Sequence, residues 1–131
     1  MSESKEKIEN NYEFAPFRLF PSERLLLCGQ QPIPLPPKIF DTLLMLVERS
    51  GNLVEKNELR EKVWADAFVE ESTLARNISI LRKIFSENVN AREEFIETVP
   101  KRGYRFIKPV RRLNVEAENE PAVWVQNPSE N

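Results

Sequence analysis

Residues 70–85 have the sequence EESTLARNISILRKIF, and residues 95–106 have the sequence FIETVPKRGYRF. The first stretch predicts an amphipathic helix, because its apolar residues recur at spacings of three and four. At 100° per residue, one stripe of side chains falls within about 40° and must face the core: Leu74, Ile78, Leu81 and Phe85. The second stretch alternates apolar and polar residues around a Pro-Lys-Arg-Gly turn, which predicts a β-hairpin with a basic tip.

The outer face of the predicted helix is polar and basic. The side chains expected on it are Ser72, Arg76, Ser79, Ile80 and Lys83, with Thr73 and Asn77 at its flanks. An outward isoleucine among such residues would find an apolar partner in the major groove of DNA, where thymine exposes a methyl group. A merely solvated charged face is the alternative interpretation of the same pattern.

The hairpin tip places Lys101 next to Arg102. Two adjacent cations can reach a phosphate, or they can enter a narrow minor groove whose negative potential attracts arginine. We expect Gly103 to hold a turn position with a positive φ, which glycine adopts without steric cost. A surface hairpin with solubilising charges is the alternative.

Positive charge is concentrated in one part of the chain. The 131 residues carry a net charge of −2, yet residues 72–112 hold ten Lys and Arg against four Asp and Glu. Residues 113–131 hold four Glu and no basic residue. Because the placement of charge decides whether a surface attracts a polyanion, residues 72–112 are the part of the chain suited to nucleic acid.

The composition argues against an enzyme and against a metal centre. The chain has no histidine, three glycines and one cysteine, Cys28. The lack of histidine removes Ser-His-Asp and Cys-His catalysis and most zinc sites, and the few glycines form no phosphate-binding loop. We therefore expect no catalytic residue, metal or cofactor. No apolar stretch approaches the roughly 20 residues that a membrane helix requires.

The pattern along the chain predicts an α+β domain over residues 12–110. Residues 1–11 are expected to form a disordered tail, and residues 111–131 an acidic linker or tail in which residues 123–125 could dock onto the domain. Short antiparallel strands are expected at the N-terminal end of the domain, from an apolar segment spanning residues 14–20 and from residues 24–28 and 32–35.

Two further helices are expected ahead of residues 70–85. Pro36 and Pro37 can begin the first, since the first helical turn needs no amide donors, and Gly51 is a suitable stop after it. Residues 56–64 form the second, and a short loop at residues 65–69 leads into the third. Three helices therefore lie between the N-terminal sheet and the C-terminal hairpin.

This order of elements resembles the OmpR/PhoB-type winged-helix effector domain. The stretches that carry the resemblance are LPPK at 35–38, GNLV at 51–54, EL at 58–59, VW at 63–64, ISILRK at 78–83 and IETVPKRGYRF at 96–106. The resemblance implies a winged helix-turn-helix that binds double-stranded DNA as a transcriptional regulator. It implies that the third helix enters the major groove and that the hairpin, or wing, contacts the backbone or the minor groove.

An N-terminal domain with this wing looks like those of the bacterial ToxR/CadC-like one-component regulators. Such a regulator would act in the cytoplasm, either alone or as a piece of a larger or membrane-anchored protein. The loop at residues 65–69 matches the transactivation loop of the family, which implies contact with RNA polymerase. The family also implies head-to-tail dimers on direct repeats of DNA.

The resemblance and the chemistry of base recognition together assign roles to individual residues. Arg76 and Asn77 would read bases, because Arg pairs with guanine and Asn with adenine in the major groove. Other residues would make supporting contacts. Short contacts with DNA are expected from Ser72, Thr73 and Ile80, and contacts with phosphate from Ser79, Arg82, Lys83 and Thr98. The contacts of the wing are expected from Lys101 and Arg102. Trp64 matches a position whose indole N–H can meet the DNA backbone, with core packing as the alternative. The family often has basic residues where Ser79 and Ile80 stand here, which implies a different base preference.

The main alternative function is a winged-helix protein–protein interaction module that does not bind DNA. Such a module would have no salt-dependent affinity for duplex DNA, whereas the basic block of residues 72–112 favours such an affinity. Recognition of RNA is disfavoured, because a helix cannot enter the narrow major groove of A-form RNA.

Overall fold

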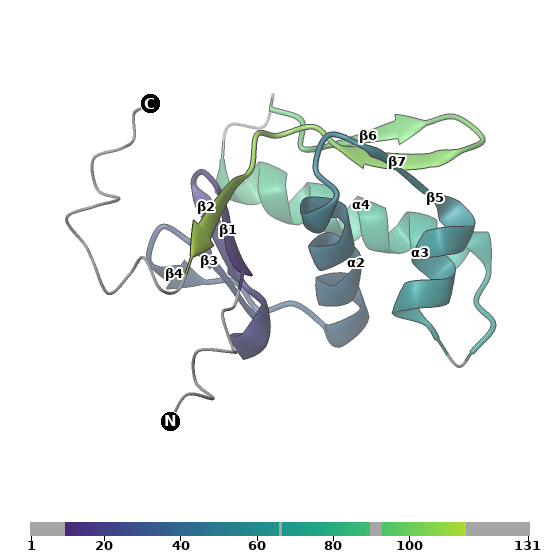
Figure 1. The fold of residues 1–131 in the computed structure, drawn as a ribbon, viewed down its shortest axis with the longest axis horizontal. Coiled ribbons are helices and arrows are strands. Elements are labelled where there is room, and N and C mark those ends of the chain that lie inside the picture. The colour runs from purple at the N-terminus through teal and green to yellow at the C-terminus, as the bar shows by residue number, and fades with distance from the viewer. Residues whose placement is uncertain (1–9, 66, 90–92, 115–131) are drawn as a thin grey trace.

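The computed structural model describes residues 10–65, 67–89 and 93–114. Over these residues the chain forms two antiparallel sheets and three α-helices (Figure 1), so the expected α+β class is confirmed. Most of the N-terminal tail and the linker beyond residue 114, with its docking segment at 123–125, lie outside the described residues. None of the described helices is long and apolar enough to cross a membrane.

The N-terminal sheet has five strands in the order β4-β3-β2-β1-β8. Their bounds are Asn10–Phe14 for β1, Phe17–Phe20 for β2, Leu25–Cys28 for β3, Gln31–Pro32 for β4 and Arg111–Asn114 for β8, with a short 3-10 helix, η1, at Pro21–Glu23. The last strand returns from the far end of the sequence to pair with the first. Both ends of the described chain therefore lie in one sheet.

Three details of this sheet differ from the sequence-based expectation. The apolar segment 14–20 is not one strand: the chain turns at Ala15-Pro16, so that Phe14 pairs with Phe17 across two antiparallel strands. The strand expected at 32–35 is confined to β4, because Pro32 and Pro34 have no amide hydrogens for a ladder. Regular structure also extends beyond the expected limits of 12–110, since β1 begins at Asn10 and β8 pairs along its edge.

The helices follow the predicted order. They are α2 at Pro37–Glu48, α3 at Lys56–Val63 and α4 at Glu71–Asn88. Gly51, just after α2, has a φ of 87°, the left-handed conformation expected at a helix end. The core stripe predicted for α4 is confirmed, because Leu74, Ile78, Leu81 and Phe85 are all buried.

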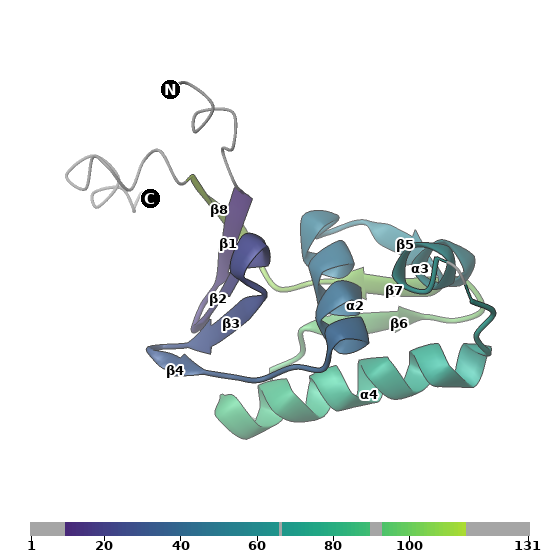
Figure 2. The same ribbon diagram turned by 90° about the horizontal axis from the view of Figure 1, so that it is seen from below.

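The second sheet contains the wing and has the order β5-β7-β6. Its strands are Leu53–Glu55 for β5, Ile96–Val99 for β6 and Gly103–Phe106 for β7. Figure 2 shows α4 running alongside the wing strands, with the wing tip near the end at which α4 begins. The helix and the hairpin that the sequence singled out are thus neighbours in space.

Five buried phenylalanines join the two sheets to α4. They are Phe14 in β1, Phe17 in β2, Phe85 in α4, Phe95 just before β6 and Phe106 in β7. Phe85 stacks on Phe95 with ring centroids 4.5 Å apart, and Phe14 meets Phe106 edge to face at 5.0 Å. Offset and edge-to-face pairs of this kind add about 0.5–1.5 kcal/mol each to the gain from burial.

Gly103 does not have the positive φ that the sequence suggested. The left-handed residue of the turn is Lys101, with a φ of 66°. Gly103 lies in β7, opposite Glu55 of β5, and a Cβ at this position would collide with the carbonyl oxygen of Val54. Glycine is required here because two backbones approach closely, which the local sequence of a hairpin does not reveal.

We expect Gly103→Ala to destabilise the fold by about 3 kcal/mol, because the new methyl group forces β5 and β7 apart. Chemical denaturation followed by circular dichroism measures the effect. Gly29→Ala is the matched control: Gly29 has a φ of 63° with open space around it, so that substitution carries only the left-handed penalty of about 1 kcal/mol. Equal losses for the two variants would contradict the proposed close approach.

Candidate nucleic-acid interface

One stripe of exposed side chains runs along α4, away from the core. Its members are Ser72, Arg76, Ser79 and Lys83, which recur at spacings of four, three and four. The Lys83 side chain is 74% exposed, and its Nζ lies 4.0 Å from a carboxylate oxygen of Glu87. The 18 residues of α4 give a helix of about 27 Å, at about 1.5 Å per residue, long enough to lie across a DNA groove.

Asn77, expected to read bases, is turned towards the core instead. It is only 7% exposed, and its Nδ2 donates a 3.4 Å hydrogen bond to Oγ1 of Thr42 in α2. The expected position of Asn77 at the flank of the outer face was wrong, because Asn77 lies only about 60° around the helix from Leu74, on the buried side. Its polar group ties α4 to α2 and is not offered to a ligand.

Two other residues of the expected outer face lie at its edges. Ile80 is half-buried and packs against the hydrophobic core, so its apolar side chain already has partners within the domain. Thr73 is also half-buried. The exposed stripe is therefore narrower than the sequence suggested and is formed by serine, arginine and lysine.

The wing tip is held by backbone hydrogen bonds. The amide of Arg102 donates to the carbonyl of Val99 at 3.0 Å, which closes the turn. The carbonyl of Arg102 accepts from the amide of Lys56, also at 3.0 Å, which joins the tip to the start of α3. Lys101 and Arg102 are both exposed at this tip, so the structure places the two wing cations where the sequence predicted them.

Carboxylates lie beside several cations of this surface. Arg102 pairs with Glu55 at 2.8 Å, and this hydrogen bond raises the pKa of the guanidinium. Lys56 pairs with Glu71 at the first turn of α4 and lowers the pKa of that carboxyl, which stays ionised at neutral pH. The roles of Glu55 and Lys56 were missed from the sequence, because only the pairing of β5 with β7 brings them to the wing.

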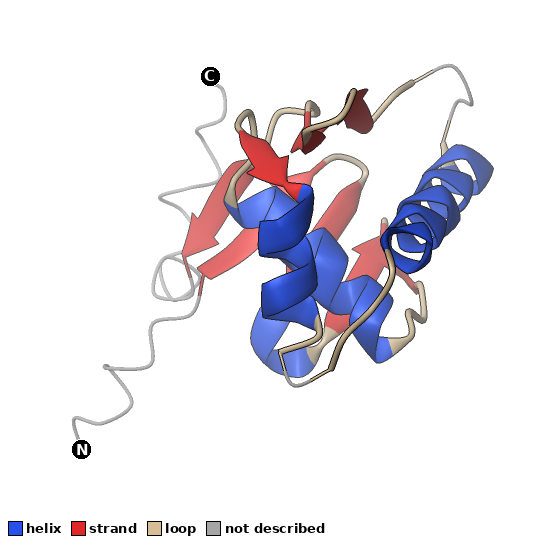
Figure 3. Ribbon diagram, turned by 90° about the vertical axis from the view of Figure 1, so that its right-hand side faces the viewer, coloured by secondary structure: helices blue, strands red, loops and turns tan. Residues whose placement is uncertain are grey.

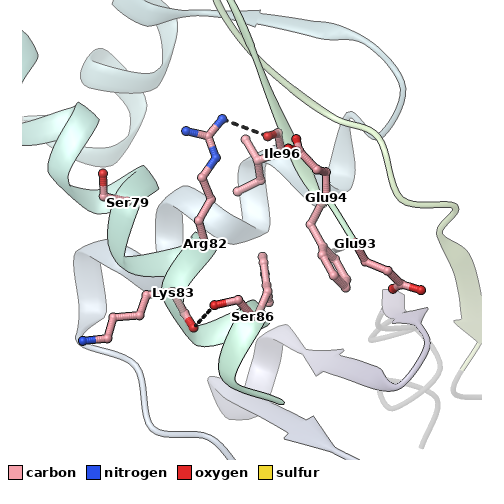
Figure 4. Close-up of a pocket in the computed structure, with 9 residues that line it drawn as sticks. Ser79, Arg82, Lys83, Ser86, Glu93, Glu94 and Ile96 are labelled. Atoms are coloured by element: carbon pink, nitrogen blue, oxygen red, sulfur yellow. Dashed lines mark hydrogen bonds between the residues drawn. The ribbon is translucent and has the colours of Figure 1, made fainter. Parts of the chain in front are cut away.

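Arg82 and Thr98, both expected on phosphate, are bonded to each other. Nη2 of Arg82 donates to Oγ1 of Thr98 at 2.9 Å and to the carbonyl of Ile96 at 2.8 Å. Figure 4 shows Arg82 reaching from α4 to the strand beside it. The two elements border an open groove of about 410 Å³ that Ser79, Lys83 and Ser86 also line.

Trp64 follows the last residue of α3 and is half-buried against the core, which agrees with the packing alternative. It also borders a shallow groove with Phe68, in the loop that leads to α4. Phe68 is 91% exposed, an unusual position for a large apolar side chain. In Figure 3, seen from the end that carries the wing tip, this loop leads into the near end of α4.

Comparisons with known proteins agree with this geometry. The sequence profile of the family described as "Transcriptional regulatory protein, C terminal" matches residues 30–106, which include all three helices and the wing. The chain is 44% identical over 85 residues to the transcriptional regulator HilA of Salmonella typhimurium, a match that covers 65% of this chain. It spans only 15% of the length of HilA.

Solved structures of DNA-binding domains are similar in fold. The DNA-binding domain of CadC from Escherichia coli has a TM-score of 0.72 and 27% identity, covering 81% of this chain and 99% of that one. The DNA-binding domain of RstA from Klebsiella pneumoniae, in complex with its RstA box, has a TM-score of 0.63 and 26% identity, covering 74% and 96%. The expected resemblance to CadC-like regulators is confirmed, and the family is one of transcription regulators and not a class of enzymes. This chain belongs to the family of transcriptional regulatory proteins that carry the OmpR/PhoB-type winged-helix DNA-binding domain.

Proposed function

We propose that this domain binds double-stranded DNA sequence-specifically, with α4 in the major groove and the wing on the backbone or in the minor groove. One observation carries the proposal: the exposed stripe of α4 and the basic wing tip belong to neighbouring elements, joined by the bonds of Arg82. A ligand that meets the helix can therefore meet the wing as well. The regularly spaced charges of a DNA duplex fit such a pair of contacts.

Base reading is assigned chiefly to Arg76. It is exposed in the first half of α4, and arginine forms two parallel hydrogen bonds with O6 and N7 of guanine. Ser72 and Ser79 lie on the same stripe and can contact bases or phosphates. Lys83, further along, is suited to phosphate, which contributes affinity and register but no sequence information.

The wing supplies contacts that do not depend on base sequence. Lys101 has no carboxylate partner among the interactions of the described residues, whereas Arg102 shares its charge with Glu55. A phosphate near Arg102 must compete with that carboxylate. Because an exposed ion pair contributes only about 0–1 kcal/mol, a polyanion can displace it.

We further propose that the whole regulator contacts other proteins and acts in the cytoplasm. The exposed Phe68 supports a protein contact at the loop of residues 65–69, where the family resemblance implies RNA polymerase. Head-to-tail pairing on direct repeats is part of the same proposal. To test the head-to-tail pairing, duplexes that bind the protein are selected from a random pool and sequenced. Two copies of one half-site in the same orientation are expected, and inverted copies would contradict the pairing.

The base-reading role is tested by Arg76→Ala, with Asn77→Ala as the matched control on the adjacent position. Arg76→Ala should weaken binding to the preferred duplex by about 1–3 kcal/mol and relax the preference at one base pair. Asn77→Ala should leave that preference unchanged and lower the unfolding free energy by about 1 kcal/mol, because it removes a buried hydrogen bond. Fluorescence anisotropy with the selected duplex and a random duplex measures the first effect, and urea denaturation the second. If Arg76→Ala binds both duplexes as the wild type does, α4 is not the reading helix.

The wing is tested by Lys101→Gly. Glycine relieves the left-handed backbone of Lys101, so stability should rise by about 1 kcal/mol. Binding to all duplexes should nevertheless weaken equally, and the slope of log affinity against log salt should flatten by about one unit. Duplex titrations at several salt concentrations measure this. Negligible binding by the wild type at low salt would instead favour the protein–protein interaction module.

A further inference from the structure

Arg82 connects α4 to the wing strand β6 through one nitrogen. Its Nη2 donates to the carbonyl of Ile96 at 2.8 Å and to the hydroxyl of Thr98 at 2.9 Å. One acceptor is a backbone carbonyl and the other is a side-chain hydroxyl, and the single nitrogen reaches both. The guanidinium thus spans the groove between helix and wing (Figure 4).

A second attachment of the wing to α4 is apolar and lies nearer the base of the hairpin. There Phe85 stacks on Phe95, just before β6 begins. An apolar stack fixes the distance between two elements but is non-directional, whereas hydrogen bonds depend steeply on angle. Arg82 therefore controls the direction of the hairpin at a point closer to its tip.

The acceptors of Arg82 are neutral. Arg102 and Arg105 instead pair with the carboxylates of Glu55 and Glu97. Arg82 keeps its full positive charge while holding the strand. Its contact consequently positions the wing without reducing the positive potential of this face.

We propose that Arg82 is a positioning residue: through Ile96 and Thr98 it holds the wing at the angle at which Lys101 reaches DNA while α4 occupies the major groove. This inference rests on the proposed function, and it gives Arg82 and Thr98 a role other than the phosphate contacts expected from the sequence. A wing oriented before binding loses less conformational entropy when the complex forms. Freeing it should weaken duplex binding about fivefold, a typical cost of ordering one or two groups.

The test uses Thr98→Val in the 131-residue chain, which removes the acceptor hydroxyl but keeps the shape and charge of the side chain. Duplex affinity is measured for the single variant, for Lys101→Ala/Arg102→Ala and for the triple variant. The expected result is a loss of about fivefold in the wild-type background and none when the wing cations are absent. Equal losses in both backgrounds would mean that Thr98 touches DNA itself, and no loss in either would overturn the positioning role.

Ser86→Ala is the matched control. Ser86 lines the same groove, but its hydroxyl donates to the carbonyl of Lys83 within α4, so its removal should leave duplex affinity unchanged. Arg82→Gln combined with Thr98→Val should be no weaker than Arg82→Gln alone, because Arg82→Gln has already removed the contact with Thr98. Additive losses would contradict this.

A measurement without DNA separates this inference from the proposed function. Heteronuclear NOE values for the amides of Lys101 and Arg102 should fall in Thr98→Val, since the loss of one of the two hydrogen bonds from Arg82 lets the hairpin move more on the ps–ns timescale. If the wild type binds no duplex, the DNA-binding proposal fails, but the NOE values still show whether the contact of Arg82 with Thr98 restrains the wing. Unchanged NOE values would overturn the positioning role whatever the DNA result.

Discussion

The packing of five phenylalanines is the constraint on which the rest of the structure depends. Phe14 and Phe17 come from the N-terminal sheet, Phe85 from α4, and Phe95 and Phe106 from the wing segment. Each ring meets others of the set at centroid distances of 4.5 to 6.3 Å. A three-stranded wing sheet and one long helix have little core of their own, so this cluster holds them against each other.

The cluster also explains why the N-terminal sheet belongs to the domain. The family profile begins at residue 30 and leaves out β1, β2 and β3. Those strands nevertheless supply Phe14, Phe17 and Leu19, all of which are buried in the same core as α4. The sheet has no part in the proposed contact with DNA, but it covers one end of the core on which α4 and the wing rest.

The polar side chains of α4 and the wing fall into two groups: some are offered to a ligand, and others form hydrogen bonds within the domain. Arg76, Lys83 and Lys101 are offered, because they are exposed and, within the described part of the chain, the carboxylate recorded beside any of them is that of Glu87, 4.0 Å from Lys83. Asn77 and Arg82 are used within the domain, since one bonds to α2 and the other to β6. Two cations adjacent on one helix, Arg82 and Lys83, can thus serve construction and recognition, and a rotation of about 100° decides between them.

The sequence by itself determined the three helices, the buried stripe of α4, the hairpin and the two cations at its tip. Helical and strand periodicity, turn residues and charge placement are local properties, so they can be read from neighbouring residues. Only the tertiary structure decided the pairing of β8 with β1, the close approach that requires glycine at position 103, the pairing of Glu55 with Arg102 and the inward turn of Asn77. Each of these joins residues far apart in the chain, or depends on which side of a helix a neighbouring element covers. No local pattern encodes such contacts, because they arise when separate elements pack together.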